Sequence, residues 1–283
     1  MHNKTFRALL SDMRWLRISH YILMLFLGGA IALSHTTQSV TTPTKQFILT
    51  SISIIFACLF SIITNNISDI RIDKISNPSR PLIKNTISIQ SYRMIAIIAL
   101  FLSIVLAFFV NYQAGITIIL FISIYYLYSM PPVRFKRIPI FSKLAISINS
   151  LLFIFLGYLL VAGSTDGFPL LLLLLFLIGF TFAANFIDIK DYKGDAIEGI
   201  KTLPVLLGPK KSALLISIFV FATYLSFYFF IKNIYFLLML IIGGCLQLYF
   251  INKKNYDERP IFLIYLTNLV IMIALLLKKH YSY

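Results

Sequence analysis

Nine apolar runs, each close to the length that crosses a bilayer, dominate this 283-residue sequence. A helix needs about 20 predominantly apolar residues to span a hydrocarbon core roughly 30 Å thick. A segment in lipid must satisfy its backbone hydrogen bonds internally, so runs of this length predict helices. We therefore expect an all-α polytopic membrane protein, with spans at 18–35, 47–64, 93–110, 114–130, 143–162, 168–187, 212–231, 234–251 and 260–277.

The distribution of positive charge predicts the orientation of these spans. The formal net charge is +15, and 21 of the 25 Lys and Arg residues fall in the N-terminal segment and in alternate loops. Basic residues collect on the cytoplasmic side of membrane proteins. We therefore expect a protein of the cytoplasmic membrane with its N-terminus inside and its C-terminus outside, and no nucleic-acid partner is needed to explain the charge. Lys278 and Lys279 lie on the predicted outer side, against this trend.

The sequence predicts a single membrane-embedded domain over residues 1–283, and nothing in it resembles a soluble domain or a linker. Residues 1–17 form an N-terminal segment with apolar side chains at helical spacing, at Phe6, Leu9, Leu10 and Met13. Basic residues occupy its other side, which is typical of an amphipathic helix in the membrane interface. The alternative is a plain extension of the first span.

Two further features concern processing and cysteine chemistry. The first apolar run is followed by no small-residue cleavage pattern, so we expect no cleavable signal peptide. Cys58 and Cys245 both fall inside apolar runs. We interpret them as small core residues, and neither a disulfide nor a metal site is indicated.

Acidic residues are rare, and six of the ten lie in two short segments, 65–92 and 188–211, which we expect to form cytoplasmic cap loops. Each segment holds two aspartates four residues apart, Asp69 with Asp73 and Asp191 with Asp195. Like charges at this spacing repel on a helix, so a cation is expected between them. Oxygen ligands without His or Cys favour Mg²⁺, which binds a few carboxylates together with phosphate oxygens. The two rows therefore predict a diphosphate held by Mg²⁺; solvated acids that balance nearby Lys and Arg are the alternative.

Basic side chains near the two rows extend the predicted site. A departing diphosphate needs positive charge beyond the metal ions, and the candidates are Arg80, Arg134, Lys136 and Lys201. Loss of diphosphate from an allylic isoprenoid leaves a carbocation, which aromatic faces stabilise and a dry cavity protects. This chemistry suits a membrane protein. A cation transporter is the alternative from another class, but its ionisable residues usually lie within the spans.

The motifs resemble those of the UbiA-type intramembrane prenyltransferase family. The first motif is matched by Asn65, Asp69, Asp73 and Arg80-Pro81, and the second by Asp191, Asp195, Gly199, Lys201, Thr202, Leu203 and Pro204. The YSMPP segment, with Tyr128, Ser129, Arg134 and Lys136, resembles the family's connection between its fourth and fifth helices. The resemblance implies nine helices around a central cavity with a cytoplasmic cap. It also implies Mg²⁺-dependent transfer of a prenyl chain from a prenyl diphosphate to an acceptor.

The resemblance also implies roles for single residues. Mg²⁺ would be held by Asn65 and the four catalytic aspartates, Asp69, Asp73, Asp191 and Asp195. The diphosphate would contact Asn65, Arg80, Tyr128, Ser129, Arg134, Lys136 and Lys201. Asp188 would lie on the acceptor side, as a base, as a group behind the metal ligands or as a loop acid. We expect an aromatic quinone-precursor acceptor, with a lipid-linked acceptor such as prenylglycerol phosphate as the alternative.

Overall fold

Helices alone make up the regular structure in the part of the chain that the computed structural model describes, residues 2–35, 43–138 and 140–281, with side chains described from Arg7 to Lys278. In chain order they are α1 (His2–Asp12), α2 (Trp15–His35), α3 (Thr44–Ser68), α4 (Ile70–Ser76), α5 (Ile89–Val110), α6 (Tyr112–Ser129), η1 (Phe135–Arg137), α7 (Phe141–Ala162), α8 (Leu170–Ala183), η2 (Ala184–Ile189), α9 (Tyr192–Ile197), α10 (Leu203–Leu207), α11 (Pro209–Phe227), α12 (Ile234–Ile251) and α13 (Glu258–Tyr281).

The predicted set of spans is confirmed. Nine helical segments within the described residues are long and apolar enough to cross a membrane: α2, α3, α5, α6, α7, α8 with η2, α11, α12 and α13. The connection between α5 and α6 is tighter than expected, because Asn111 alone joins them and its side chain caps α6 by accepting a hydrogen bond from the Ala114 N–H (2.8 Å). The connection between α11 and α12 is longer than expected, because α11 already ends at Phe227.

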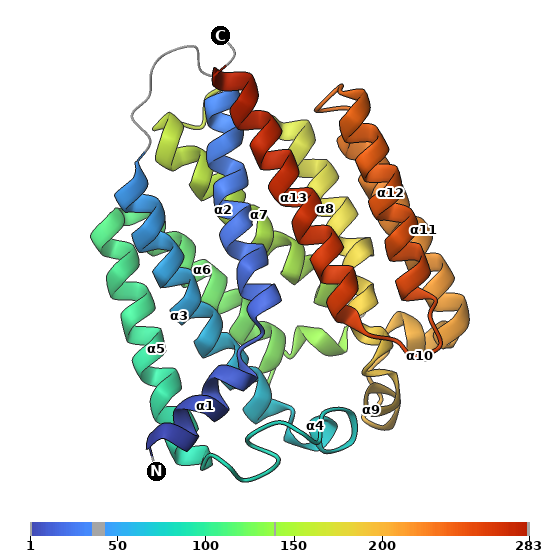
Figure 1. The fold of residues 1–283 in the computed structure, drawn as a ribbon. Helices are drawn as coiled ribbons and strands as arrows, with labels where there is room; N and C mark the ends of the chain where they lie inside the picture. The colour runs from blue at the N-terminus through green and yellow to red at the C-terminus, as the bar shows by residue number, and fades with distance from the viewer. Residues whose placement is uncertain (1, 36–42, 139, 282–283) are drawn as a thin grey trace.

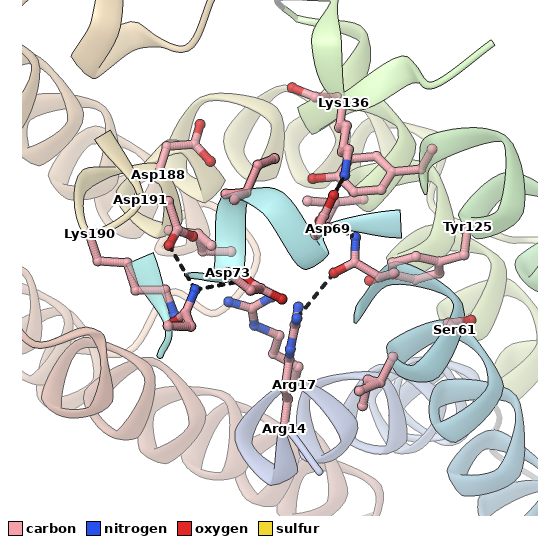
Figure 2. Close-up of a pocket in the computed structure, with 18 of the residues that line it drawn as sticks. Arg14, Arg17, Ser61, Asp69, Asp73, Tyr125, Lys136, Asp188, Lys190 and Asp191 are labelled. Carbon is pink, nitrogen blue, oxygen red and sulfur yellow. Dashed lines mark hydrogen bonds and ion pairs between the residues drawn. The ribbon is translucent and has the colours of Figure 1, made fainter. Parts of the chain in front are cut away.

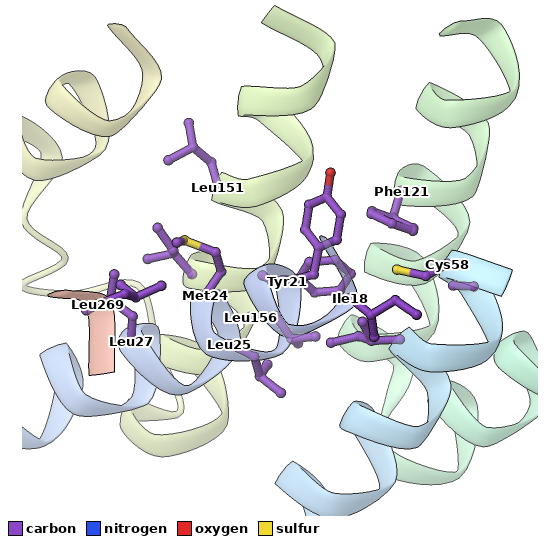
Figure 3. Packing of buried hydrophobic residues seen from close by; sticks show 14 of the residues in the cluster. Ile18, Tyr21, Met24, Leu25, Leu27, Cys58, Phe121, Leu151, Leu156 and Leu269 are labelled. Carbon is purple, nitrogen blue, oxygen red and sulfur yellow. The ribbon is translucent and has the colours of Figure 1, made fainter. Parts of the chain in front are cut away.

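Helix α2 lies at the centre of the bundle and packs against α7, α13 and α3 (Figure 1). Figure 3 shows its side chains Ile18, Tyr21 and Met24 among residues of the neighbouring helices. Two glycines allow α2 and α7 to approach closely. A Cβ on Gly28 would lie 1.9 Å from the Ile154 carbonyl oxygen, and one on Gly157 would lie 1.9 Å from the Leu25 carbonyl oxygen. Small residues bring membrane helices together in this way.

The short helices α1, α4, α9 and α10 gather at one end of the bundle (Figure 1). This is the end at which we predicted the cytoplasmic loops, although the structure contains no membrane and the orientation stays a prediction. Helix α1 ends at Asp12 and α2 begins at Trp15, so the N-terminal segment is a separate helix and not an extension of the first span. The first span therefore begins three residues earlier than predicted, at Trp15 and not at residue 18. Of its predicted apolar face, the Phe6 side chain lies outside the described residues.

The two cysteines differ in environment. Cys58 is buried, as predicted, on the side of α3 that faces the core. Cys245 is exposed on α12, so its interpretation as a core residue was wrong. Hydropathy does not separate a side chain that faces protein from one that faces lipid, because both surroundings are apolar.

Candidate functional site

A cavity of about 1100 Å³, including the open space at its mouth, lies at the end of the bundle that carries the short helices. Both acidic rows line it, together with six basic side chains (Figure 2). The basic residues are Arg14, Arg17, Arg80, Lys136, Lys143 and Lys190. We name it the polar cavity. The fold therefore brings the two acidic segments together at one cavity, as the sequence predicted.

The first acidic row lies where α3 gives way to α4. Asp69 is the junction residue between the two helices, and the Asp73 N–H donates to its carbonyl oxygen at 2.8 Å, so the one-turn spacing persists across the junction. Asn65, one turn earlier, donates from Nδ2 to Asp69 Oδ2 at 3.0 Å. Asn65, Asp69 and Asp73 consequently present their side chains to the polar cavity as one row.

Basic side chains pair with both carboxylates of this row. Lys136, from η1, donates to Asp69, and Arg80 donates to Asp73. Arg134 reaches Asp69 from behind, at 3.4 Å, while it also donates to the Ser68 carbonyl oxygen at 3.0 Å. The cations expected between the aspartates are thus supplied by the chain itself.

The second row lies on α9, which packs against α4. Asp191 precedes α9 and Asp195 lies in its first turn. Gly194 permits the contact, because a Cβ there would lie 2.4 Å from Ser76 Oγ. Asn77 joins the rows: its Nδ2 donates to Asp73 Oδ1 at 3.1 Å and to Asp191 Oδ1 at 3.3 Å.

Burial changes the proton affinity of several of these groups. It raises the pKa of Asp195 to about 7, with the nearby Asp188 and Asp191 carboxylates adding to the effect. It lowers the pKa of Lys136 to about 7. It also raises the pKa of Asp73, although Arg80 and Arg14 act in the opposite direction. A buried charge is disfavoured unless a partner compensates it, so the cavity is prepared to accept charged groups that provide such compensation.

Sequence reasoning missed several residues of the polar cavity. Arg14 lies at the break between α1 and α2 and donates to Asn65 Oδ1 (3.1 Å) and Asn66 Oδ1 (2.9 Å). Lys143 donates to Asp188 at 2.6 Å, and Asp188 Oδ2 is buried without a partner. Arginines that follow an amphipathic helix are a usable signal for Arg14, whereas Lys143 was hidden at the start of an apolar run.

Arg17 and Lys190 were also missed. They share the Glu258 carboxylate, at 3.3 Å and 2.6 Å, and Figure 2 shows Lys190 on the opposite side of the cavity from Lys136. This links α2 and η2 to the start of α13. No local sequence motif connects three segments so far apart, so only the fold reveals the pairing.

The predicted site residues fall into three groups. Those that line the polar cavity are Asn65, Asp69, Asp73, Arg80, Tyr128, Lys136, Asp188, Asp191 and Asp195. Ser129 and Arg134 lie behind the first row, where Ser129 Oγ accepts a hydrogen bond from Asn65 Nδ2 at 3.2 Å. Lys201 is exposed and lies off the cavity, which its neighbours Ile200 and Thr202 line instead.

A second, mainly apolar cavity of about 830 Å³ adjoins the first. Five residues line both cavities: Arg17, Tyr21, Tyr125, Ile146 and Ile187. We name it the aromatic cavity, because its wall contains the rings of Tyr21, Tyr125, Phe180, Phe186, Tyr224, Phe227, Phe262 and Tyr265. The pair of cavities suits an amphiphile with an anionic head and a long hydrocarbon tail.

The donor set in the polar cavity is compatible with Mg²⁺ only if a ligand completes it. Among the described residues, no three carboxylates, histidines or cysteines come together as a ready metal site. The available donors are nevertheless oxygens, from two aspartates on each row and the Asn65 amide. Mg²⁺ commonly takes one or two carboxylates plus substrate phosphate oxygens, which fits two half-sites that face each other.

The UbiA prenyltransferase family model matches residues 22–270. The digeranylgeranylglyceryl phosphate synthases of Sulfurisphaera tokodaii and Methanobrevibacter smithii are 30% and 31% identical, over 61% and 66% of this chain and 63% and 66% of their own lengths. The homogentisate phytyltransferase of a Synechocystis strain is 33% identical over 51% of this chain and 49% of its own.

Solved structures share the fold. A UbiA homologue from Archaeoglobus fulgidus, solved with GPP and Mg²⁺, superposes with a TM-score of 0.68 at 21% identity, over 96% of this chain and 98% of that one. A digeranylgeranylglyceryl phosphate synthase superposes with a TM-score of 0.60 at 22% identity, over 96% and 99%. The predicted nine-helix architecture is thereby confirmed.

Proposed function

This chain belongs to the UbiA prenyltransferase family, and on that premise we propose that it catalyses Mg²⁺-dependent transfer of a prenyl chain from a prenyl diphosphate to a lipid-soluble acceptor. One observation carries the proposal: Asn77 joins two aspartate rows in a polar cavity that lies next to the aromatic cavity and shares five lining residues with it. The head of the donor would lie in the first cavity and its tail in the second.

Mg²⁺ would be held by Asn65, Asp69, Asp73, Asp191 and Asp195, whose oxygens face the polar cavity. When bound, the metal would neutralise charge on the diphosphate and help it to leave as an anion. A structural neighbour solved with GPP and Mg²⁺ supports the choice of metal.

The basic residues would exchange their present partners for the diphosphate. Arg80 and Lys136 now hold Asp73 and Asp69, and both line the cavity. Once the carboxylates bind metal, these two cations are free to contact phosphate oxygens. Arg134 and Ser129 would keep the row in place from behind, through Asp69 and Asn65. Preorganised charge of this kind stabilises the leaving group more in the transition state than in the ground state.

The junction of the two cavities would hold the reacting carbon. Tyr21 and Tyr125 line both cavities, and their hydroxyls lie 2.6 Å apart. This bond fixes the two rings beside the path from head to tail. Their faces stabilise a developing allylic cation, and the apolar wall keeps water from quenching it.

For the acceptor, we propose a prenylated glycerol phosphate, which is the lipid-linked alternative of the sequence analysis. Two relatives named as digeranylgeranylglyceryl phosphate synthases support this choice. The charges support it as well, because Arg17 and Lys190 provide a second cationic group across the cavity from Lys136. The aromatic quinone-precursor acceptor is the second candidate, supported by the similarity to a homogentisate phytyltransferase.

Asp188 would receive the proton of the acceptor hydroxyl. Lys143 holds one of its oxygens, and the other, Oδ2, is buried without a partner. An orphaned carboxylate oxygen in a closed site is a suitable hydrogen-bond acceptor for a hydroxyl that becomes a nucleophile.

The test uses purified protein in nanodiscs with radiolabelled geranylgeranyl diphosphate, with and without Mg²⁺. Geranylgeranylglyceryl phosphate and homogentisate are offered as acceptors in parallel. We expect Mg²⁺-dependent transfer to the glycerol phosphate. Transfer to homogentisate alone would replace the acceptor assignment, and absence of both transfer and Mg²⁺-dependent donor binding would refute the proposed function.

A further inference from the structure

The aromatic cavity ends at a wall, and a third cavity lies behind it. The third cavity, of about 290 Å³, is lined mainly by apolar side chains of α8, α11, α12 and α13. Among the described residues, three line both cavities: Tyr224, Phe227 and Tyr265. They therefore form the partition between the aromatic cavity and the space behind it.

Contacts from neighbouring helices hold this partition in place. The Phe227 ring lies against Phe176 of α8, with 4.7 Å between ring centroids. The Tyr265 hydroxyl bonds to Nδ1 of His20 at 2.8 Å, and Ser150 engages the other ring nitrogen of His20 at 2.7 Å. Side chains of α2, α7 and α8 therefore all support the wall.

The wall also presents polar groups to the aromatic cavity. Tyr224 is 4% exposed, and its hydroxyl lies beside the polar side chains of Asn268 and Gln247. Gln247 donates to the Ile261 carbonyl oxygen at 2.7 Å, while its own Oε1 is buried without a partner. A hydrocarbon tail offers these polar groups no hydrogen-bond partner. This surface therefore disfavours further extension of a tail.

We propose that Tyr224, Phe227 and Tyr265 set the longest prenyl chain that the protein transfers. This inference rests on the proposed function, with the donor tail in the aromatic cavity. A tail that reaches the wall extends no further in that direction, and a longer one must turn back, leave through the open side of the cavity or displace the wall. A smaller side chain at Phe227 would join the space it vacates to the third cavity, whose lining of Phe176, Phe236 and Leu240 suits a hydrocarbon.

The test compares donors of increasing length, from geranyl to farnesylgeranyl diphosphate, with one acceptor and with product length read by mass spectrometry. Phe227→Ala joins the two cavities and is expected to raise the transfer of the longest donor, relative to the wild-type optimum, by roughly tenfold. Phe227→Leu removes less volume and is expected to give a smaller shift in the same direction. It also guards against misfolding, because Phe→Leu leaves a smaller void in the packed interior than Phe→Ala.

Val220→Phe provides the opposite change. Val220 lines the aromatic cavity one helical turn before Tyr224, so a larger side chain there shortens the space in front of the wall. It should shift the preference toward shorter donors. Phe262→Ala is the matched control, because Phe262 lines the aromatic cavity but not the third one.

Each outcome has one meaning. If wild-type protein transfers no donor, the proposed function fails. If it transfers prenyl chains but neither Phe227 variant changes the length profile, the wall does not set chain length. An equal shift in Phe262→Ala would mean that any loosening of the cavity suffices, which also overturns the inference.

Discussion

At the scale of single residues, the two aspartate rows differ in how the negative charge of their carboxylates is compensated. Asp69 and Asp73 each have a basic partner, whereas the side chain that bonds Asp191 is the neutral amide of Asn77. Removing a carboxylate from the first row leaves a buried cation unpaired. Removing one from the second row does not, so variants there separate function from folding more cleanly.

Asp191→Asn tests the metal-binding role of the second row. We expect Mg²⁺-dependent turnover to fall by at least ~100-fold, because a charged ligand is lost where leaving-group charge develops. The melting temperature in detergent should stay near that of the wild type. Glu198→Gln is the control, since Glu198 lies at the end of the same helix and pairs with Arg137 at 3.6 Å, outside the polar cavity. Wild-type activity in Asp191→Asn would contradict the assignment.

The raised pKa of Asp195 predicts a pH dependence of stability in metal-free protein. The pKa is about 7 in the folded state against an ordinary value of 3.8. The folded state therefore binds the proton more tightly, so the carboxyl costs no stability below about pH 4. As the pH rises, the buried carboxylate lowers the free energy of unfolding by an increasing amount. The loss reaches its full value, roughly 4 kcal/mol at most, above about pH 7.

Asp195→Asn removes this penalty. In buffer with EDTA, its melting temperature should exceed that of the wild type by more at pH 8 than at pH 5. A difference that stays constant over this range would show that burial does not perturb Asp195. Asp166→Asn, at an exposed residue in the loop before α8, is the control and should show no such trend.

At the scale of elements, the close approach of α2 and α7 depends on glycine. A Cβ on Gly28 would overlap backbone atoms of Ile154, which cannot move aside without separating the helices. Gly28→Ala should therefore destabilise the protein by roughly 3 kcal/mol or more, visible as loss of the monodisperse peak in size-exclusion chromatography after heating.

Gly29→Ala is the matched control for this prediction. A Cβ there would meet the far end of the Phe47 ring, at 2.6 Å, and a side chain is able to turn away. We expect a clearly smaller loss of stability. Equal effects of the two variants would show that backbone contact is not what limits the distance between α2 and α7.

Sequence patterns predict some elements of this protein well, for physical reasons. Apolar runs long enough to cross a bilayer admit helices and little else, so the nine spans follow from hydropathy. The two aspartate rows could be predicted from the i, i+4 spacing of acids that are rare in this sequence. The roles of Asn77, Lys143 and Arg17 could not be predicted, because they depend on which helix ends meet in space. The exposure of Cys245 also needed the fold, since a lipid-facing residue is as apolar as a core residue.

At the scale of the whole molecule, the described short helices lie at one end of the bundle and the loop before α8 lies at the other (Figure 1). The charge bias predicts that the first end faces the cytoplasm. In a Cys58→Ala, Cys245→Ala background, Thr165→Cys should react with an impermeant maleimide on intact cells. Ser79→Cys, which is exposed near α4, should react only after permeabilisation. The reverse pattern would invert the orientation.

The ion pairs of Lys136 with Asp69 and of Arg80 with Asp73 have a consequence for how the protein is switched on. At the first row, Mg²⁺ alone would compete with Lys136 and Arg80 for the carboxylates, and a diphosphate alone would compete with Asp69 and Asp73 for the basic side chains. Bound together, the metal would take the carboxylates and the diphosphate would take the two cations. Under the proposed function, Mg²⁺ and the diphosphate would therefore bind cooperatively, each favouring the binding of the other. Without substrate, the two ion pairs would compensate the buried charges of the first row, so this row would not depend on a bound metal for its stability.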